Sequence, residues 1–127
     1  MSRKTITTSN APQAIGPYSQ AIQCGSFLFV SGQIALDPET GQLVNGDAAS
    51  QTRQIMENIK GVVEAAGMSL KNIVKCTIYL KNMGDFTTVN DIYGRYFNVE
   101  PPARATVEVS ALPKNVTVEI DAIAYRE

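Results

Sequence analysis

Two charged residues near the C-terminus, Arg104 and Glu119, are the strongest candidates for chemistry in this sequence. The guanidinium of an arginine can hold a carboxylate through two parallel hydrogen bonds. A glutamate nearby could hold or deprotonate a water molecule. Both residues also have a structural alternative: Arg104 could form an ion pair with Glu108, Glu119 or Asp121, and Glu119 could belong to a salt bridge.

Four further positions are weaker candidates for a binding site. Ser31 and Gly32 follow an apolar run, and a glycine lets a ligand approach the backbone closely. A bulge or the end of a strand would explain the same residues. Tyr18 lies in a Gly-Pro-Tyr-Ser loop, where a turn with the ring at the core edge is the alternative. Asn90 lies in an expected helix, where capping or exposure to solvent is the alternative.

The sequence contains no histidine. Its absence excludes catalysis with a histidine base, histidine-ligated zinc or haem, and a histidine pH switch. The two cysteines, Cys24 and Cys76, form no Cys-x-x-Cys motif and cannot complete a four-ligand metal site. We therefore expect no metal site, and expect both thiols to be small buried side chains in a reducing, cytoplasmic compartment.

Length and charge narrow the class of protein further. The 127 residues are expected to form a single domain, 1–127. A formal net charge of −1 and a pI of about 5.4 argue against a nucleic-acid partner. The N-terminus does not resemble a signal peptide, and no run approaches the roughly 20 apolar residues of a membrane span.

Hydrophobic periodicity predicts strands, a helix, a strand, a second helix and two strands. The strands are expected at 4–8, 20–24, 27–30, 73–80, 103–109 and 116–125, and the helices at 48–66 and 86–97. Asp47 and Gly67 are the expected caps of the first helix. The continuous apolar run at 27–30 predicts a strand buried on both faces.

Two amphipathic helices can cover only one face of a mixed sheet, which indicates an α+β fold. The other face is expected to carry a mixture of side chains: Ile73, Thr77, Tyr79, Arg104, Thr106, Glu119 and Ile123. Pairing of the last two strands would bring Arg104 and Glu119 together on this face. Because a half-apolar face is seldom left in water, we expect it to pack against other copies of the chain.

Several segments carry a family resemblance. The most specific reads Pro-Ala-Arg-Ala-Thr-Val-Glu-Val at 102–109, with Leu-Pro-Lys at 112–114 and Val-Glu-Ile at 118–120. Other matching segments are 16–21, 30–34, Gln51-Thr52 with Asn58-Ile59, and Asp85-Phe86 with Val89-Asn90 and Tyr93. Together they resemble the reactive intermediate deaminase A family, also called the YjgF/YER057c/UK114 family, over essentially the whole chain.

The resemblance implies a chorismate-mutase-like α+β fold: a mixed sheet with two helices on one face. It also implies a homotrimer with a central barrel-like core and ligand clefts between subunits. The implied activity is that of an enamine/imine deaminase. Such an enzyme hydrolyses 2-iminobutanoate or 2-iminopropanoate, released by pyridoxal-phosphate dehydratases, to 2-oxo acids and ammonia, without a metal or organic cofactor.

The resemblance also implies roles for particular residues. Arg104 would bind the substrate carboxylate and Glu119 would position or activate water. The cleft would be lined by Tyr18, Ser31, Gly32 and Asn90, and the backbone around Thr106 would contact the imine nitrogen. Some family members carry cysteine in place of Thr106, so thiol-based switching should not be transferred to this chain.

Two other classes of function stay open. One is a non-catalytic protein that binds a 2-oxo acid as a regulatory signal or behaves as a chaperone; family members have also been linked with translation inhibition and ribonuclease activity. The nuclease interpretation is the least favoured, because the chain is slightly acidic and lacks histidine and an aromatic-basic stripe. The other is an interaction module with no small-molecule site.

Overall fold

The computed structural model describes residues 3–44 and 46–127. Six strands and two α-helices follow in the order β1 (Arg3–Ile6), β2 (Ala21–Cys24), β3 (Phe27–Gln33), α1 (Ala48–Ala65), β4 (Ile73–Leu80), α2 (Phe86–Gly94), β5 (Ala103–Glu108) and β6 (Val118–Tyr125). Short 3₁₀ turns lie at Leu70–Asn72, Met83–Asp85 and Pro113–Asn115. No helix within the described residues has the length and apolar character needed to cross a bilayer.

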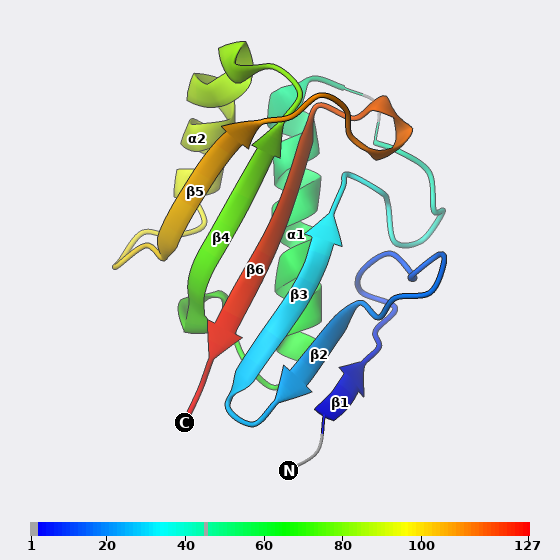
Figure 1. Ribbon diagram of the computed structural model, residues 1–127, viewed down its shortest axis with the longest axis vertical. Coiled ribbons are helices and arrows are strands. Elements are labelled where there is room, and N and C mark those ends of the chain that lie inside the picture. The colour runs from blue at the N-terminus through cyan, green and yellow to red at the C-terminus, as the bar shows by residue number, and fades with distance from the viewer. Residues whose placement is uncertain (1–2, 45) are drawn as a thin grey trace.

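The strands form one mixed sheet in the order β1-β2-β3-β6-β4-β5, in which only β4 and β5 are parallel neighbours. The last strand, β6, lies between β3 and β4. The connections through α1 and α2 both cross the same face of the sheet (Figure 1). The expected α+β fold, with two helices on one face, is therefore confirmed.

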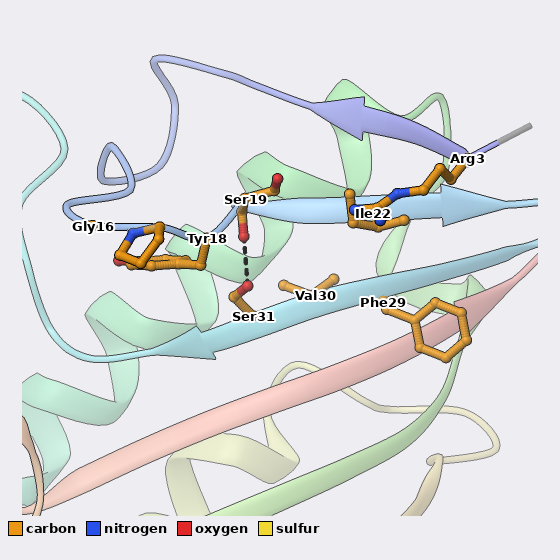
Figure 2. A pocket seen from close by; sticks show the side chains of 9 residues that line it. Arg3, Gly16, Tyr18, Ser19, Ile22, Phe29, Val30 and Ser31 are labelled. Carbon is orange, nitrogen blue, oxygen red and sulfur yellow. Dashed lines mark hydrogen bonds between the residues drawn. The ribbon is translucent and has the colours of Figure 1, made fainter.

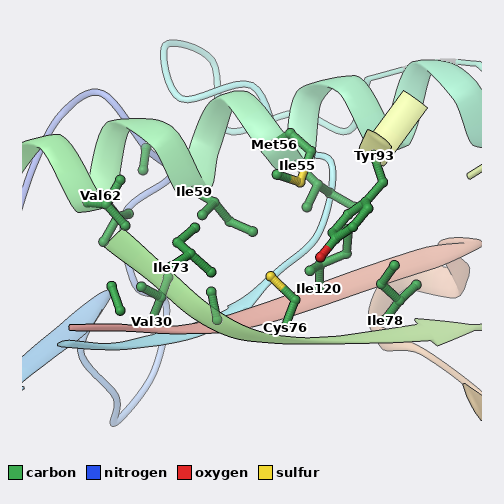
Figure 3. Packing of buried hydrophobic residues seen from close by; sticks show 14 of the residues in the cluster. Val30, Ile55, Met56, Ile59, Val62, Ile73, Cys76, Ile78, Tyr93 and Ile120 are labelled. Atoms are coloured by element: carbon green, nitrogen blue, oxygen red, sulfur yellow. The ribbon is translucent and has the colours of Figure 1, made fainter. Parts of the chain in front are cut away.

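The main core lies between α1 and the sheet (Figure 3). Most of the apolar stripe predicted for the first helix is buried. No surface is exposed at Ile55, Met56, Ile59, Val62 and Val63, whereas Ala66, just beyond the helix, is partly buried. Asp47 accepts a hydrogen bond from Ser50 N at 3.0 Å, and Gly67 has a φ of +78° just beyond the helix. Both predicted caps are therefore confirmed.

The prediction that residues 27–30 are buried on both faces is wrong. Phe27 and Phe29 are 42% and 47% exposed, whereas Leu28 and Val30 are buried. β3 also extends to Gln33, with a register shift against β6 between Val30 and Gln33. Ser31 and Gly32 therefore form a bulge inside the strand, the structural alternative for these residues.

The predicted facing at the start of β4 is also wrong, because a second register shift occurs there. Ile73, expected on the open face, is 5% exposed and belongs to the core, whereas Val74 is 44% exposed. The pairing of β4 with β6 is irregular between Ile73 and Lys75. One irregular position reverses the alternation of side chains, and periodicity alone does not reveal where it falls.

The open face of the sheet carries an aromatic patch at the end near the β2–β3 turn. The ring of Phe27 lies 6.1 Å from that of Phe29 and 5.0 Å from that of Tyr125. No described helix covers this face (Figure 1). Its association with other copies of the chain stays a prediction.

Gly61 generates a stability prediction, because this buried position of α1 touches the loop at Asn10. A Cβ on Gly61 would lie 3.0 Å from the carbonyl carbon of Asn10 and closer still to its oxygen. Gly61→Ala should therefore lower the free energy of unfolding by about 1–3 kcal/mol, although alanine favours helices. Urea denaturation at fixed protein concentration measures the change.

The matched control is Gly94→Ala at the end of α2, where a Cβ would meet nothing within 4 Å. This change should be neutral or slightly stabilising. Equal effects of the two substitutions would contradict the packing argument.

Candidate functional site

Glu119 lies near the start of β6, on the open face of the sheet. Its neighbours Val118 and Ile120 are fully buried on the helical side, so strand alternation points Glu119 the other way. The glutamate side chain packs over Gly32 in the β3 bulge, where a Cβ would lie 2.9 Å from Glu119 Cδ. Any larger residue at position 32 would therefore displace the carboxylate.

A groove of about 570 Å³ opens beside this carboxylate. It is lined by Pro12, Gln13, Ile15, Tyr18, Gln20, Ser31, Gly32, Gln33, Ile34, Leu36, Pro113, Lys114 and Glu119. The structure thus brings together four of the predicted site residues: Tyr18, Ser31, Gly32 and Glu119. The groove has an acidic group at one wall and apolar side chains at others, as small-molecule sites commonly do.

Tyr18 and Ser31 also line an adjoining pocket on the side of Arg3 and Phe29 (Figure 2). Ser31 Oγ donates a hydrogen bond to the carbonyl of Ser19 at 2.6 Å, which joins β3 to the Tyr18 loop. Tyr18 itself is 53% exposed. Its ring is therefore accessible to a ligand and does not pack at the core edge, the alternative suggested by its loop.

Burial raises the pKa of Glu119 above the ordinary value for a glutamate, and the negative charge of Asp121 raises it further. Asp121 is two residues along the same strand face and accepts a hydrogen bond from Tyr79 Oη at 3.0 Å. Burial and this hydrogen bond likewise raise the pKa of Tyr79. The carboxylate of Glu119 is therefore a stronger proton acceptor than an exposed one.

The buried side chain of Gln20 fixes the loop that forms one wall of the groove. Its Nε2 donates to the carbonyls of Thr8, Ala11 and Pro12 at 3.0, 3.2 and 2.7 Å. Its Oε1 accepts from Thr8 N at 2.8 Å. One buried amide thus bonds to four backbone groups of this loop, with the two N–H hydrogens shared among three carbonyls.

Polar residues on α1 hold two further segments of the site. Asn58 is fully buried and donates to the carbonyl of Leu36 at 3.0 Å, next to the groove wall. Gln51 Oε1 accepts from Thr117 N and Thr117 Oγ1 at 3.1 and 3.0 Å, just before Glu119. These ties explain why amide side chains interrupt the apolar face of the helix.

Arg104 lies on the helical side of the sheet, at the edge strand β5. It pairs with Cys76, whose side chain is in the core. Arg104 Nη1 donates to Asn90 Oδ1 on α2 at 2.6 Å. Within residues 3–44 and 46–127 no ion pair involves Arg104, so the proposed structural partners Glu108, Glu119 and Asp121 do not neutralise it.

The expectation that Arg104 and Glu119 share a face is wrong for a single chain. β4 separates β5 from β6, and the two side chains leave opposite faces of the sheet. The expected facing of β5 assumed that Val107 points into the core, yet Val107 is 41% exposed. The open face is itself apolar in part, so hydrophobicity does not identify the inner side of this edge strand.

Thr106 follows Arg104 on the same side of β5, pairs with Ile78 and is half-buried. Its hydroxyl is buried and, among the described residues, has no hydrogen-bond partner. Cys76 is buried as expected, and burial raises the pKa of its thiol to about 11. Cys24 is only half-buried, so the expectation of burial is met in part.

Several residues near the candidate site lie in the family-matching segments but were not predicted as site residues: Gln20, Lys114, and Phe86 and Tyr93, whose rings face Arg104. The two rings belong to an apolar helical stripe and resemble ordinary core residues. One feature of the sequence could have identified them as site residues: the polar residue Asn90 falls on the same helical face, at i+4 from Phe86. Among the described residues, no group of three or more cysteine, aspartate or glutamate side chains could hold a metal.

Comparisons with known proteins agree with this fold. Residues 8–126 match the family model described as Endoribonuclease L-PSP. A RutC family protein of Pyrococcus horikoshii is 57% identical over 125 residues, which cover 98% of this chain and 99% of that protein. A 2-iminobutanoate/2-iminopropanoate deaminase of Salmonella typhimurium is 51% identical over 126 residues, covering 97% and 98%.

The backbone of this chain also closely resembles that of a solved structure. E. coli TdcF with bound serine superposes with a TM-score of 0.94 at 43% identity, covering 98% of this chain and 99% of that one. Agreement of sequence and fold over nearly the whole length confirms the resemblance carried by the motifs. The chain belongs to the reactive intermediate deaminase A (YjgF/YER057c/UK114) family.

Proposed function

We propose that this protein hydrolyses 2-imino acids, such as 2-iminobutanoate and 2-iminopropanoate, to 2-oxo acids and ammonia. The observation that carries the proposal is that Arg104 is exposed and, among the residues the structure describes, forms no ion pair with a carboxylate. Such a group is suited to bind the carboxylate of a small substrate. Two relatives named as 2-iminobutanoate/2-iminopropanoate deaminases, which are 51% and 49% identical to this chain, support the same activity.

The active site would be formed by two copies of the chain. Arg104 and Glu119 leave opposite faces of the sheet, so one subunit cannot present both to a small ligand. The exposed aromatic patch of the open face offers apolar surface for association. We propose a homotrimer in which Arg104 and Asn90 of one subunit face Tyr18, Ser31, Gly32 and Glu119 of a neighbour.

The reaction requires few groups, because the imine carbon is already electrophilic. Arg104 would hold the carboxylate, and Glu119 would orient a water and accept its proton as the oxygen bonds to that carbon. Transfer of that proton to nitrogen gives a carbinolamine, in which the carbon–nitrogen bond is single. The hydroxyl group then loses its proton, which passes to the nitrogen, and the carbon–nitrogen bond breaks to release ammonia and leave the 2-oxo acid. The backbone at Thr106 would contact the imine nitrogen. No metal or organic cofactor takes part in this scheme.

Replacement of Arg104 tests the proposed carboxylate contact. Arg104→Ala should reduce the rate of enzymatic hydrolysis at least about a hundredfold, because it removes the cation proposed to bind the substrate carboxylate. The assay generates imines from serine, threonine or leucine and follows their disappearance above the rate in buffer. Arg95→Ala is the control, since Arg95 is an exposed residue just after α2 and pairs with Asp91. Full activity of Arg104→Ala would refute the assignment.

The raised pKa of Glu119 predicts the acid limb of the pH profile. The carboxylate must be ionised to accept a proton, so the enzymatic rate should fall as the pH drops through a value above the ordinary 4.5. Asp121→Asn removes a negative charge that raises this pKa, and should therefore move the acid limb to lower pH. Steady-state rates between pH 4 and 8 measure the shift; an unchanged limb would show that another group controls it.

Mixed oligomers test whether two subunits share a site. Arg104→Ala and Glu119→Gln should each be inactive alone. If the residues act from different subunits in a closed ring, random mixing at equal ratio restores about a quarter of the sites. Co-expression or refolding of the two variants, followed by the imine assay, measures this recovery. Activity that stays at the level of the single variants would place both residues in one subunit.

The second candidate is binding of a small amino or oxo acid without turnover, and the structure of E. coli TdcF with bound serine favours it. Binding of a 2-oxo acid by a protein that does not accelerate imine hydrolysis would support this function. The family description also names an endoribonuclease. A nuclease activity equal in wild type and Arg104→Ala would indicate a contaminant rather than this site.

A further inference from the structure

The exposed guanidinium of Arg104 contacts three side chains of α2. Its Cζ lies 5.6 Å from the ring centroid of Phe86 and 5.3 Å from that of Tyr93. Nη1 donates to Asn90 Oδ1 at 2.6 Å. Positions 86, 90 and 93 are spaced i, i+4 and i+7, so they lie on one face of the helix.

None of these three contacts carries a formal negative charge. Two are aromatic faces, which attract a cation through their quadrupole, and the third is a neutral amide oxygen. Among residues 3–44 and 46–127 the recorded ion pair joins Arg95 to Asp91, not Arg104 to a carboxylate. The guanidinium is therefore held in place while its charge stays available to a ligand.

We propose that Phe86, Asn90 and Tyr93 are positioning residues that hold the Arg104 guanidinium ready for a substrate carboxylate. The inference rests on the proposed function, in which Arg104 binds that carboxylate. The rings limit the tilt of the guanidinium plane, and the hydrogen bond to Asn90 limits its rotation. One of five N–H donors is used in this contact, so the others remain for a bidentate pair with the ligand.

This role differs from the one implied for Asn90 by family resemblance. The amide acts through Arg104 rather than by contact with the substrate. Its neutrality is essential to the role, because an aspartate of the same shape would form an ion pair with Arg104. That ion pair would compete directly with the incoming carboxylate.

Positioning of this kind lowers the cost of binding, because a long flexible side chain is ordered before the ligand arrives. Its loss should therefore raise KM and weaken ligand binding more than it lowers kcat. A purely structural role for the two rings in the core would instead reduce the stability of the fold and leave the affinity of the folded protein unchanged. The two roles can thus be separated by measurement.

The main test compares wild type with Asn90→Asp and Phe86→Leu. Binding of 2-oxobutanoate is measured by calorimetry, and KM and kcat by the imine assay. Asn90→Asp should raise both Kd and KM about tenfold or more, with kcat changed less than about threefold. Phe86→Leu should raise them about three- to tenfold, since a leucine packs but offers no aromatic face.

Conservative variants and a neighbouring control complete the design. Phe86→Tyr and Tyr93→Phe keep the aromatic faces and should retain most of the wild-type affinity for 2-oxobutanoate. Asp91→Asn changes the next residue of α2, whose carboxylate pairs with Arg95 rather than with Arg104, and should leave Kd unchanged. Thermal unfolding of each variant separates loss of fold from loss of affinity.

The outcomes distinguish this inference from the proposed function. Normal affinity in folded Asn90→Asp and Phe86→Leu, together with loss of binding in Arg104→Ala, would overturn the positioning role and leave the deaminase proposal intact. Normal binding and turnover in Arg104→Ala would overturn both. Raised Kd in Asn90→Asp and Phe86→Leu with recovery in Phe86→Tyr is the result that supports positioning.

Discussion

The structure depends above all on the covering of its sheet from one side. Both helical connections cross the same face, which concentrates the apolar core there and leaves the other face open. An aromatic patch remains on that open face, at Phe27, Phe29 and Tyr125. The same arrangement separates Arg104, on the helical side, from Glu119, on the open side. Association of two copies is therefore the condition on which our proposed active site depends.

Amide side chains connect this framework to the candidate site. Gln20 satisfies the backbone of one groove wall, Asn58 holds the neighbouring segment, and Gln51 fixes the chain just before Glu119. Buried amides are costly unless they are hydrogen-bonded, so each also specifies the conformation of the loop that it serves. The groove residues consequently rest on the rigid α1–sheet core although several of them lie in loops.

The surroundings of Glu119 and Arg104 suit them to their proposed roles in different ways. Glu119 is half-buried near Asp121, which raises its pKa and makes its carboxylate a better proton acceptor. Arg104 is exposed, yet it is held by two rings and an amide that leave its charge uncompensated. A substrate with a carboxylate and an electrophilic carbon needs little more from the protein than these two groups. The lack of histidine is compatible with such chemistry.

Sequence patterns were enough to predict the α+β class and the first helix with its caps, to exclude histidine chemistry and to reveal the family motifs around Arg104 and Glu119, because periodicity and residue type are local properties. They did not determine the bulges at Ser31-Gly32 and Val74, nor the direction in which Arg104 points. Those features depend on strand order and register, which are set by contacts between distant segments. In the folded chain β4 lies between β5 and β6, and its register with these two neighbours directs Arg104 and Glu119 to opposite faces of the sheet.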